Sequence, residues 1–197
     1  KHHFGIIYQP FTDEMFIGFN NSCNYLHKSK TNKIFVRNCK KISNAIIHTT
    51  DPNMGTNLEN FAMSKLRSNC RLSRYSLDAY AYGLLANGNI DLIVEASMQF
   101  YDIQAPLCVI KSAGGFFSDW TGGNNFSDGR ILACGSDHVH KEALEILSKY
   151  GGVWMDISCW GTESFDWIQE IQTKYNPQVI GFRYPNVKSC NIMESWF

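Results

Sequence analysis

The chain has 197 residues, enough for one sizeable core or for one domain with an appendage. Its 18 basic and 18 acidic residues give a formal net charge of zero, which argues against a broad electrostatic surface for nucleic acid or for an anionic membrane. No apolar run approaches the roughly 18 to 20 residues that cross a bilayer, and no signal-peptide pattern opens the chain. A cytoplasmic or organelle-matrix protein, with neither nucleic acid nor membrane as a partner, is therefore expected.

The first residues and the cysteines add two expectations. The chain begins with Lys1 and not Met, and it enters an apolar run at once, which suggests a fragment or a processed piece. His2 and His3 are expected to be surface residues, with a tag remnant or a weak metal pair as alternatives. The seven cysteines are scattered and never form CxxC, so we expect reduced thiols that mostly fill the core.

Short β-rich runs dominate the first fifty residues. Residues 4–8 and 14–19 flank a segment of turn residues, which predicts an antiparallel hairpin. Residues 25–27 and 34–37 are predicted as further short strands around a polar loop, 28–33. The first part of the chain therefore reads as all β.

From residue 45 onward, strands alternate with helices. Residues 45–50 read as a buried strand, and Thr56 is a suitable cap for a helix that runs to about residue 67. A short strand near Arg71 and a helix over 75–86 are expected next.

The second half of this region continues the alternation. Residues 91–96 read as a buried strand, and Asp102 begins a helix that stops at Gly114 and Gly115 before another strand. Residues 131–134 form a further strand and 138–150 a surface helix. Such an order predicts a layered α/β fold.

Gly151 and Gly152 mark an expected boundary between residues 1–150 and a C-terminal extension, 151–197. The extension holds four of the five tryptophans. A helix over 165–174 and a strand over 178–184 are predicted there, without a recognisable motif.

Asp102 is the first candidate for chemistry. A carboxylate at a strand-to-helix turn lies where a helix dipole and free backbone amides can hold phosphate or help to place a metal. The plain alternative is a helix cap.

Two stretches carry a resemblance to a known family. Tyr101-Asp102-Ile103-Gln104-Ala105, nine residues before Gly114-Gly115, resembles the second signature of the inositol monophosphatase-like metal-dependent phosphatases. The stretch RYSLDAYAY, residues 74–82, is similar to the histidinol-phosphatase branch. The resemblance covers roughly residues 4 to 149, and it implies the layered α/β sandwich of this family, incomplete at the N-terminus, with residues 1–150 as its C-terminal two thirds.

The function implied is that of a magnesium-dependent phosphomonoesterase. The histidinol-phosphatase branch implies hydrolysis of L-histidinol phosphate, a small phosphorylated metabolite, late in histidine biosynthesis, and family members are commonly homodimers. The alternatives are an inositol monophosphatase or related small-phosphate phosphatase, and a non-catalytic remnant that acts as a binding module. A further alternative is that the incomplete sheet does not fold stably and aggregates.

By this resemblance, Asp102 matches a Mg²⁺ ligand, since magnesium favours hard oxygen ligands. Glu95 matches a position that contacts the non-phosphate part of the substrate, the alternative being an exposed carboxylate at a strand end. Asp78 and Arg74 are candidates for substrate contact, or they pair with each other as i and i+4 on a helix surface. His48 is expected to be a strand residue with a satisfied ring.

The resemblance also has gaps. The family's upstream Glu and its Asp-Pro-Ile-Asp-Gly-Thr signature are absent from the chain, and the segment 51–56 is only a superficial echo of the latter. One carboxylate cannot hold two or three Mg²⁺ ions, so the chain is expected to be inactive or to lack a segment. Ser76 and Leu77 stand where the branch usually has small residues, and Pro106 is expected in the first turn of its helix.

Overall fold

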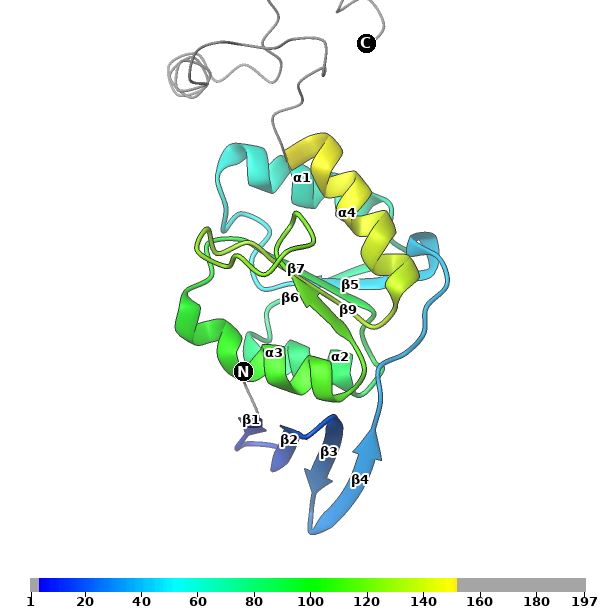
Figure 1. The fold of residues 1–197 in the computed structure, drawn as a ribbon, viewed down its shortest axis with the longest axis vertical. Helices are drawn as coiled ribbons and strands as arrows, with labels where there is room; N and C mark the ends of the chain where they lie inside the picture. Colours follow the sequence, from blue (N-terminus) through cyan, green and yellow to red (C-terminus); the bar gives the residue numbers. More distant parts are fainter. Residues whose placement is uncertain (1–3, 152–197) are drawn as a thin grey trace, which may run out of the picture. The chain divides into compact units, whose positions relative to one another are not determined.

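The computed structural model describes residues 4–151 (Figure 1). In chain order, the elements are β1 (Phe4–Gln9), β2 (Glu14–Phe19), β3 (Ser22–His27), β4 (Lys30–Ile34), the 3₁₀ turn η1 (Ile42–Asn44), β5 (Ile46–Thr49), α1 (Asn57–Ser68), β6 (Leu72–Tyr75), α2 (Ala79–Ala86), β7 (Leu92–Glu95), α3 (Phe100–Ser112), β8 (Phe116–Ser118), β9 (Ile131–Cys134) and α4 (Asp137–Gly151). The predictions for His2, His3 and the C-terminal extension lie outside these residues.

Strands β1 to β4 form an antiparallel sheet in sequence order. The predicted hairpin is confirmed, because β1 and β2 pair along their full length. The predicted polar loop over 28–33 is wrong. Lys28 and Ser29 both have positive φ and make a tight two-residue turn, so the polar residues after them continue as β4. The strand predicted at 34–37 correspondingly ends at Ile34.

A glycine pair brings this sheet against α3. Gly5 and Gly18 are cross-strand partners. A Cβ added at Gly18 would lie 2.8 Å from the Val109 Cα, and one at Gly5 would lie 2.8 Å from the Cys108 Cβ. The absence of side chains at the two glycines therefore lets α3 lie directly on the inner face of the sheet.

The second sheet has the order β6-β5-β7-β9-β8. Strands β6, β5 and β7 are parallel, whereas β9 runs antiparallel to both β7 and β8. The strand expected near Arg71 is confirmed as β6. The residues of β7 and β9 are all buried, as expected for strands covered by helices on both faces.

Helices separate and cover the two sheets (Figure 1). Helices α2 and α3 lie between them and share one core with both, while α1 and α4 cover the far face of the five-stranded sheet and enclose a second core. The expected layered α/β architecture is confirmed. Within the described residues, no helix is both long and apolar enough to span a bilayer.

The helices begin where predicted in one case and elsewhere in two others. Helix α1 has its cap at Thr56, as predicted, with a capping box completed by Glu59. Helix α2 begins at Ala79 and not at residue 75, because β6 extends to Tyr75 and a turn follows. Pro106 lies inside α3 and not in its first turn, since the helix already starts at Phe100.

Candidate functional site

The candidate site lies at the carboxyl ends of β5, β6 and β7, which end at the same edge because they are parallel. The connecting segments meet there. A Cβ added at Gly55, after β5, would lie 3.0 Å from the Ala96 Cβ, after β7. One added at Gly129, before β9, would lie 2.6 Å from the Met98 backbone nitrogen. This edge is therefore walled by three segments that are distant in sequence.

Glu95 ends β7 inside this edge and is fully buried. Thr50 donates from its backbone N–H to both carboxylate oxygens, at 3.0 and 3.1 Å, and from its hydroxyl to Oε1 at 2.8 Å. The Thr49 hydroxyl donates to Oε2 at 3.2 Å. The alternative of an exposed strand-end carboxylate is therefore wrong, and contact with a substrate requires Thr50 or a covering segment to move.

Burial raises the pKa of Glu95 to about 7. The hydrogen bonds from Thr50 and Thr49 oppose this shift, and the negative charge of Asp78 adds to it. Glu95 can thus change its charge near neutral pH, which is a property of functional sites more often than of structural carboxylates.

Asp78 lies at the end of a turn with an uncommon backbone. Ser76, Leu77 and Asp78 have φ values of 70°, 73° and 45°, a region that residues with side chains rarely adopt. Asp78 is exposed and precedes α2, and its charge acts on both Glu95 and His48. Strain of this kind gathers at binding sites, so the turn is a candidate part of the site.

Arg74 is an exposed residue of β6, and it donates to the carbonyl of its neighbour Ser73 at 3.1 Å. The predicted alternative of a helix-surface pair with Asp78 is wrong, because Arg74 lies on a strand and the two side chains form no ion pair in the described part of the chain.

Asp102 occupies the third position of α3 and is exposed. Its Oδ2 accepts a hydrogen bond from the Gln99 backbone N–H at 3.0 Å, so it does cap the helix. Because Pro106 has no N–H, it cannot donate to the Asp102 carbonyl four residues earlier. The second carboxylate oxygen of Asp102 and its backbone carbonyl, which has no N–H donor at position 106, are therefore both available to a ligand.

Tyr82 of α2 lies near enough to Glu95 and Asp102 for the negative charges of both to act on it. Its ring is almost fully buried, and its hydroxyl has no hydrogen-bond partner among the described residues. Burial raises its pKa well above the usual value, and both carboxylates add to this shift. His48 is the expected strand residue, and its ring is fully buried; within residues 4–151 its ring nitrogens form no hydrogen bond of good geometry, although the Tyr75 backbone lies close enough to act on the ring. Burial lowers the pKa of His48, while the Tyr75 backbone and Asp78 act in the opposite direction.

These buried partners carry no recognisable signal in the sequence. Thr49 and Thr50 read as ordinary strand-end residues, and Tyr82 falls in an apolar helix. The expected i+2 alternation places Ile93 and Glu95 on one face of β7, but only the pairing of β5 with β7 shows that Thr50 reaches Glu95.

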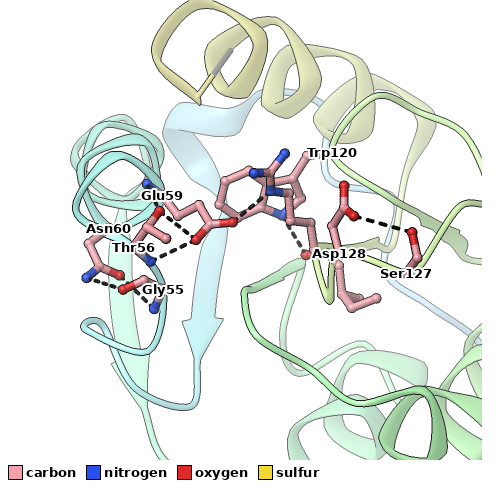
Figure 2. A network of polar contacts seen from close by, with 9 residues as sticks. Gly55, Thr56, Glu59, Asn60, Trp120, Ser127 and Asp128 are labelled. Carbon is pink, nitrogen blue, oxygen red and sulfur yellow. Dashed lines mark hydrogen bonds and ion pairs between the residues drawn. The ribbon is translucent and has the colours of Figure 1, made fainter. Parts of the chain in front are cut away.

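A polar network holds the rim of the site (Figure 2). Arg130 donates to Glu59 at 2.7 Å and lies over the Trp120 ring, at 5.9 Å from its centroid. Glu59 also accepts from the Thr56 backbone N–H at 2.8 Å. These contacts connect the start of α1 to the segment before β9, and so they hold two of the segments around the site in place relative to each other.

The described residues do not form a metal site on their own. No group of three or more His, Cys, Asp or Glu side chains in residues 4–151 is arranged to hold an ion. Asp102 supplies one exposed carboxylate, whereas both carboxylate oxygens of Glu95 already accept hydrogen bonds from Thr49 and Thr50. A Mg²⁺ ion bound here would depend on ligands from elsewhere, such as a substrate phosphate.

The sequence and fold were compared with known proteins. A model of the inositol monophosphatase family matches residues 1–151. The bifunctional phosphatase IMPL2, chloroplastic, of Arabidopsis thaliana is 34% identical over 154 residues, covering 73% of this chain and 43% of that protein. An inositol-1-monophosphatase of Rhizobium meliloti is 26% identical over 151 residues, covering 73% of this chain and 54% of that protein. The chain thus spans about half the length of the curated relatives it matches.

Solved structures agree. An inositol monophosphatase from Zymomonas mobilis superposes with a TM-score of 0.69 at 31% identity, covering 74% of this chain and 57% of that chain. None of these three names refers to histidinol phosphate, so the expected branch is not confirmed. The layered fold and the phosphatase family are confirmed, and the chain belongs to the inositol monophosphatase family.

Proposed function

We propose that this chain carries part of the active site of a phosphomonoesterase that cleaves small phosphorylated metabolites with the help of Mg²⁺. The observation that carries the proposal is the gathering of Asp78, Glu95 and Asp102 at one edge of the sheet. Tyr82 lies within electrostatic range of Glu95 and Asp102, and Asp78 within range of Glu95. The family match over residues 1–151 supports the same class of reaction.

In this proposal Asp102 is a magnesium ligand. Its carboxylate is exposed at the start of α3, and hard oxygen ligands suit Mg²⁺. Magnesium in phosphoryl-transfer sites is commonly held by one or two carboxylates together with the substrate phosphate. When bound, the ion would offset charge on the phosphate; the chain's own contribution is to hold Asp102 at a helix start and Glu95 behind it.

Inositol monophosphate is the first substrate candidate, because inositol monophosphatases appear among the relatives of known sequence and of known structure. L-histidinol phosphate is the second. The observation that favours it is the pair of nearby acids Asp78 and Glu95, which would stabilise a substrate ammonium group. A polyol has no such charge, so the two candidates are distinguishable.

Two further parts of the proposal concern organisation. Residues 1–150 form the phosphatase portion, and 151–197 are an extension of unassigned role. The protein acts as a homodimer. The rival from another class is a non-catalytic binding module, which releases no phosphate from either substrate.

Release of inorganic phosphate from inositol monophosphate and from histidinol phosphate, measured with and without Mg²⁺, tests the proposal. The protein used joins this chain to an upstream segment that carries the family's Glu and its Asp-Pro-Ile-Asp-Gly-Thr signature, because the described residues do not form a metal site on their own. Asp102→Asn is expected to lower the turnover by at least about a hundredfold, because it removes a charged oxygen ligand. Asp137→Asn, at the start of α4, is the control and should leave the rate unchanged. Lack of turnover at high protein concentration, or equal rates for the two variants, would contradict the proposal.

A further inference from the structure

The segment between β7 and α3 connects two carboxylates of the candidate site, Glu95 and Asp102. Its path decides where α3 begins, because only residues 96–101 lie between the two. Within this segment, Ser97 has a φ of 57°, in the left-handed region that residues with a Cβ rarely adopt. A backbone of this kind persists only where the surrounding structure holds it. The segment therefore needs support from another part of the chain.

Gly129, in the loop before β9, supplies this support. The Met98 N–H donates to the Gly129 carbonyl oxygen at 3.0 Å. Gly129 is buried with a φ of 67°, and a Cβ added to it would lie 2.6 Å from both the backbone nitrogen and the carbonyl oxygen of Met98. The same Cβ would lie 2.9 Å from the Ser97 carbonyl carbon. Because these are backbone atoms, they cannot turn away as a flexible side chain does, and so this approach requires glycine.

The helix cap that holds Asp102 follows Met98 directly. The Gln99 N–H donates to Asp102 Oδ2 at 3.0 Å, and the Asp102 N–H donates to the Gln99 carbonyl oxygen at 3.0 Å. The rigid peptide between Met98 and Gln99 transmits any displacement of the Met98 backbone to this cap. The location of the Asp102 carboxylate thus depends on the contact between Met98 and Gly129.

The loop that ends at Gly129 is held at its start by Asp119. This buried carboxylate accepts three hydrogen bonds at Oδ1: from the Thr121 N–H at 2.8 Å, the Thr121 hydroxyl at 2.6 Å and the Gly123 N–H at 2.9 Å. Its Oδ2 accepts from the Asn125 N–H at 2.9 Å. A buried carboxylate with donors on both oxygens fixes the loop backbone around it, since each lost hydrogen bond would leave a buried charge poorly satisfied.

Phe126 holds the other end of the loop. Its ring lies edge to face on the Phe117 ring of β8, with centroids 5.6 Å apart, and it packs against the core that α2 and α3 share with both sheets. The Phe126 carbonyl oxygen accepts from the Gly129 N–H at 3.1 Å. Because it is anchored at both ends, the loop keeps Gly129 in a fixed location beside Met98.

We propose that Gly129 is a positioning residue for Asp102: it fixes the backbone from which the Asp102 carboxylate extends. Gly129 acts through Met98 and the cap of α3, and its importance for metal binding rests on the proposed function of Asp102. Residues that support a metal ligand commonly change metal affinity by about 10- to 100-fold when they are mutated.

Gly129→Ala and Gly114→Ala form a matched pair of variants. Gly114 follows α3, and its φ of 87° is also positive. A Cβ added there would meet no atom within 4 Å in the part of the chain that the structure describes. Both changes therefore strain the backbone, whereas only Gly129→Ala displaces Met98.

Hydrogen exchange of the full chain without metal provides the first measurement. Three amides report on the contact, those of Met98, Gln99 and Asp102. In Gly129→Ala they should exchange about tenfold faster than in the wild type, the effect of weakening about one hydrogen bond. The amides of β5 and β7 report any change in global stability and correct for it. After this correction, Gly114→Ala should leave the three amides unchanged.

The Mg²⁺ dependence of phosphate release provides the second measurement, with the chain joined to the upstream segment as in the test of the proposed function. Gly129→Ala should raise the Mg²⁺ concentration for the half-maximal rate by about tenfold or more. The substrate KM at saturating Mg²⁺ should change less, because the displaced backbone carries the metal ligand. Gly114→Ala should alter neither value.

Asp119→Asn is the second variant, and it serves if Gly129→Ala does not fold. Asparagine keeps one acceptor oxygen and loses the other, so the loop loosens while no atom is added beside Met98. The same three amides should exchange about threefold faster, and the Mg²⁺ requirement should rise by a similar factor.

Equal exchange of the three amides in Gly129→Ala and Gly114→Ala would overturn the proposal, as would unchanged exchange in Asp119→Asn. Faster exchange with an unaltered Mg²⁺ dependence would also overturn it, because Gly129 would then support the fold and not the site. A joined wild-type protein that releases no phosphate would instead contradict the proposed function, while exchange in the metal-free chain would still decide whether Gly129 positions Asp102.

Discussion

At the residue scale, Glu95 has the most unusual environment in the candidate site. It is fully buried, yet its oxygens accept hydrogen bonds from three donor groups, the Thr50 backbone N–H and the hydroxyls of Thr50 and Thr49. These hydrogen bonds favour the charged form, while burial and Asp78 disfavour it, and burial wins. The folded protein therefore binds a proton at Glu95 more tightly than the unfolded chain does.

Stability should consequently fall as the pH rises from about 4.5 to about 7, because the pKa of Glu95 is raised from its ordinary 4.5 to about 7 in the folded state. A raised folded pKa gives stability that is present below the unfolded pKa and lost through the folded one. The loss should be on the order of 1.4 kcal/mol per pH unit in this window, before any relaxation of the site. Urea unfolding at a series of pH values measures it.

Glu95→Gln should flatten this slope, whereas Glu145→Gln, an exposed change on α4, should preserve it. Glu14, Glu59 and Asp119 have lowered pKa values through hydrogen bonds and, for Glu59, Arg130. Their contribution is lost as the pH falls below about 4.5, so it lies outside the window. The lowered pKa values of His48 and His140 act inside the window and raise stability with pH, so the difference in slope between the wild type and Glu95→Gln, and not the wild-type slope alone, measures Glu95. An unchanged slope in Glu95→Gln would show that another group titrates there.

At the element scale, the turn between β6 and α2 combines strain with a location at the site. Three successive residues with side chains hold positive φ, and Leu77 among them is 45% exposed and loses little packing if it is truncated. Positive φ costs a residue with a Cβ about 1 to 2 kcal/mol, whereas glycine adopts it freely.

Leu77→Gly should therefore raise the free energy of unfolding by about 0.5 to 1 kcal/mol, the relief of strain being partly offset by the entropy that glycine gains in the unfolded chain. Leu77→Ala keeps the Cβ and should bring no such gain. Chemical denaturation of both variants measures the difference. A loss of stability in Leu77→Gly, with none in Leu77→Ala, would mean that the turn is not strained in solution.

At the scale of the whole molecule, the two sheets share one core through α2 and α3. Residues 4–151 should therefore unfold in a single cooperative step, with the amides of both sheets protected by the same free energy in hydrogen exchange. A single cooperative transition in a monodisperse sample would contradict the alternative that the incomplete sheet does not fold stably and aggregates.

Gly18→Ala probes this coupling. The added Cβ meets the α3 backbone, with 2.8 Å to the Val109 Cα and 2.9 Å to the Cys108 carbonyl oxygen, so a loss of about 1 to 3 kcal/mol is expected. The loss should appear equally in β1 to β4 and in β5 to β9. Asn32→Ala, at an exposed position of β4, is the control. A loss confined to the amides of β1 to β4 would show that the two sheets unfold separately.

Local sequence patterns predict most of the elements in their order and the location of Asp102 near a helix start. These depend on local signals: alternating apolar residues, the Thr56 cap and the Gly114-Gly115 stop. Local signals failed where a turn was unmarked by glycine, at Lys28 and Ser29 and at Ser76 to Asp78, so that β4 was missed and α2 was begun too early.

Which side chains meet depends on the tertiary structure. Glu95 lies against Thr50 because β5 and β7 are neighbours in a parallel sheet, and the same sheet buries the His48 ring. The sequence pattern also does not show that Phe4 and Phe19 are exposed, since alternation assigns residues to two faces of a strand without indicating which face is covered. Contacts between residues distant in sequence depend on strand order, which no local pattern encodes.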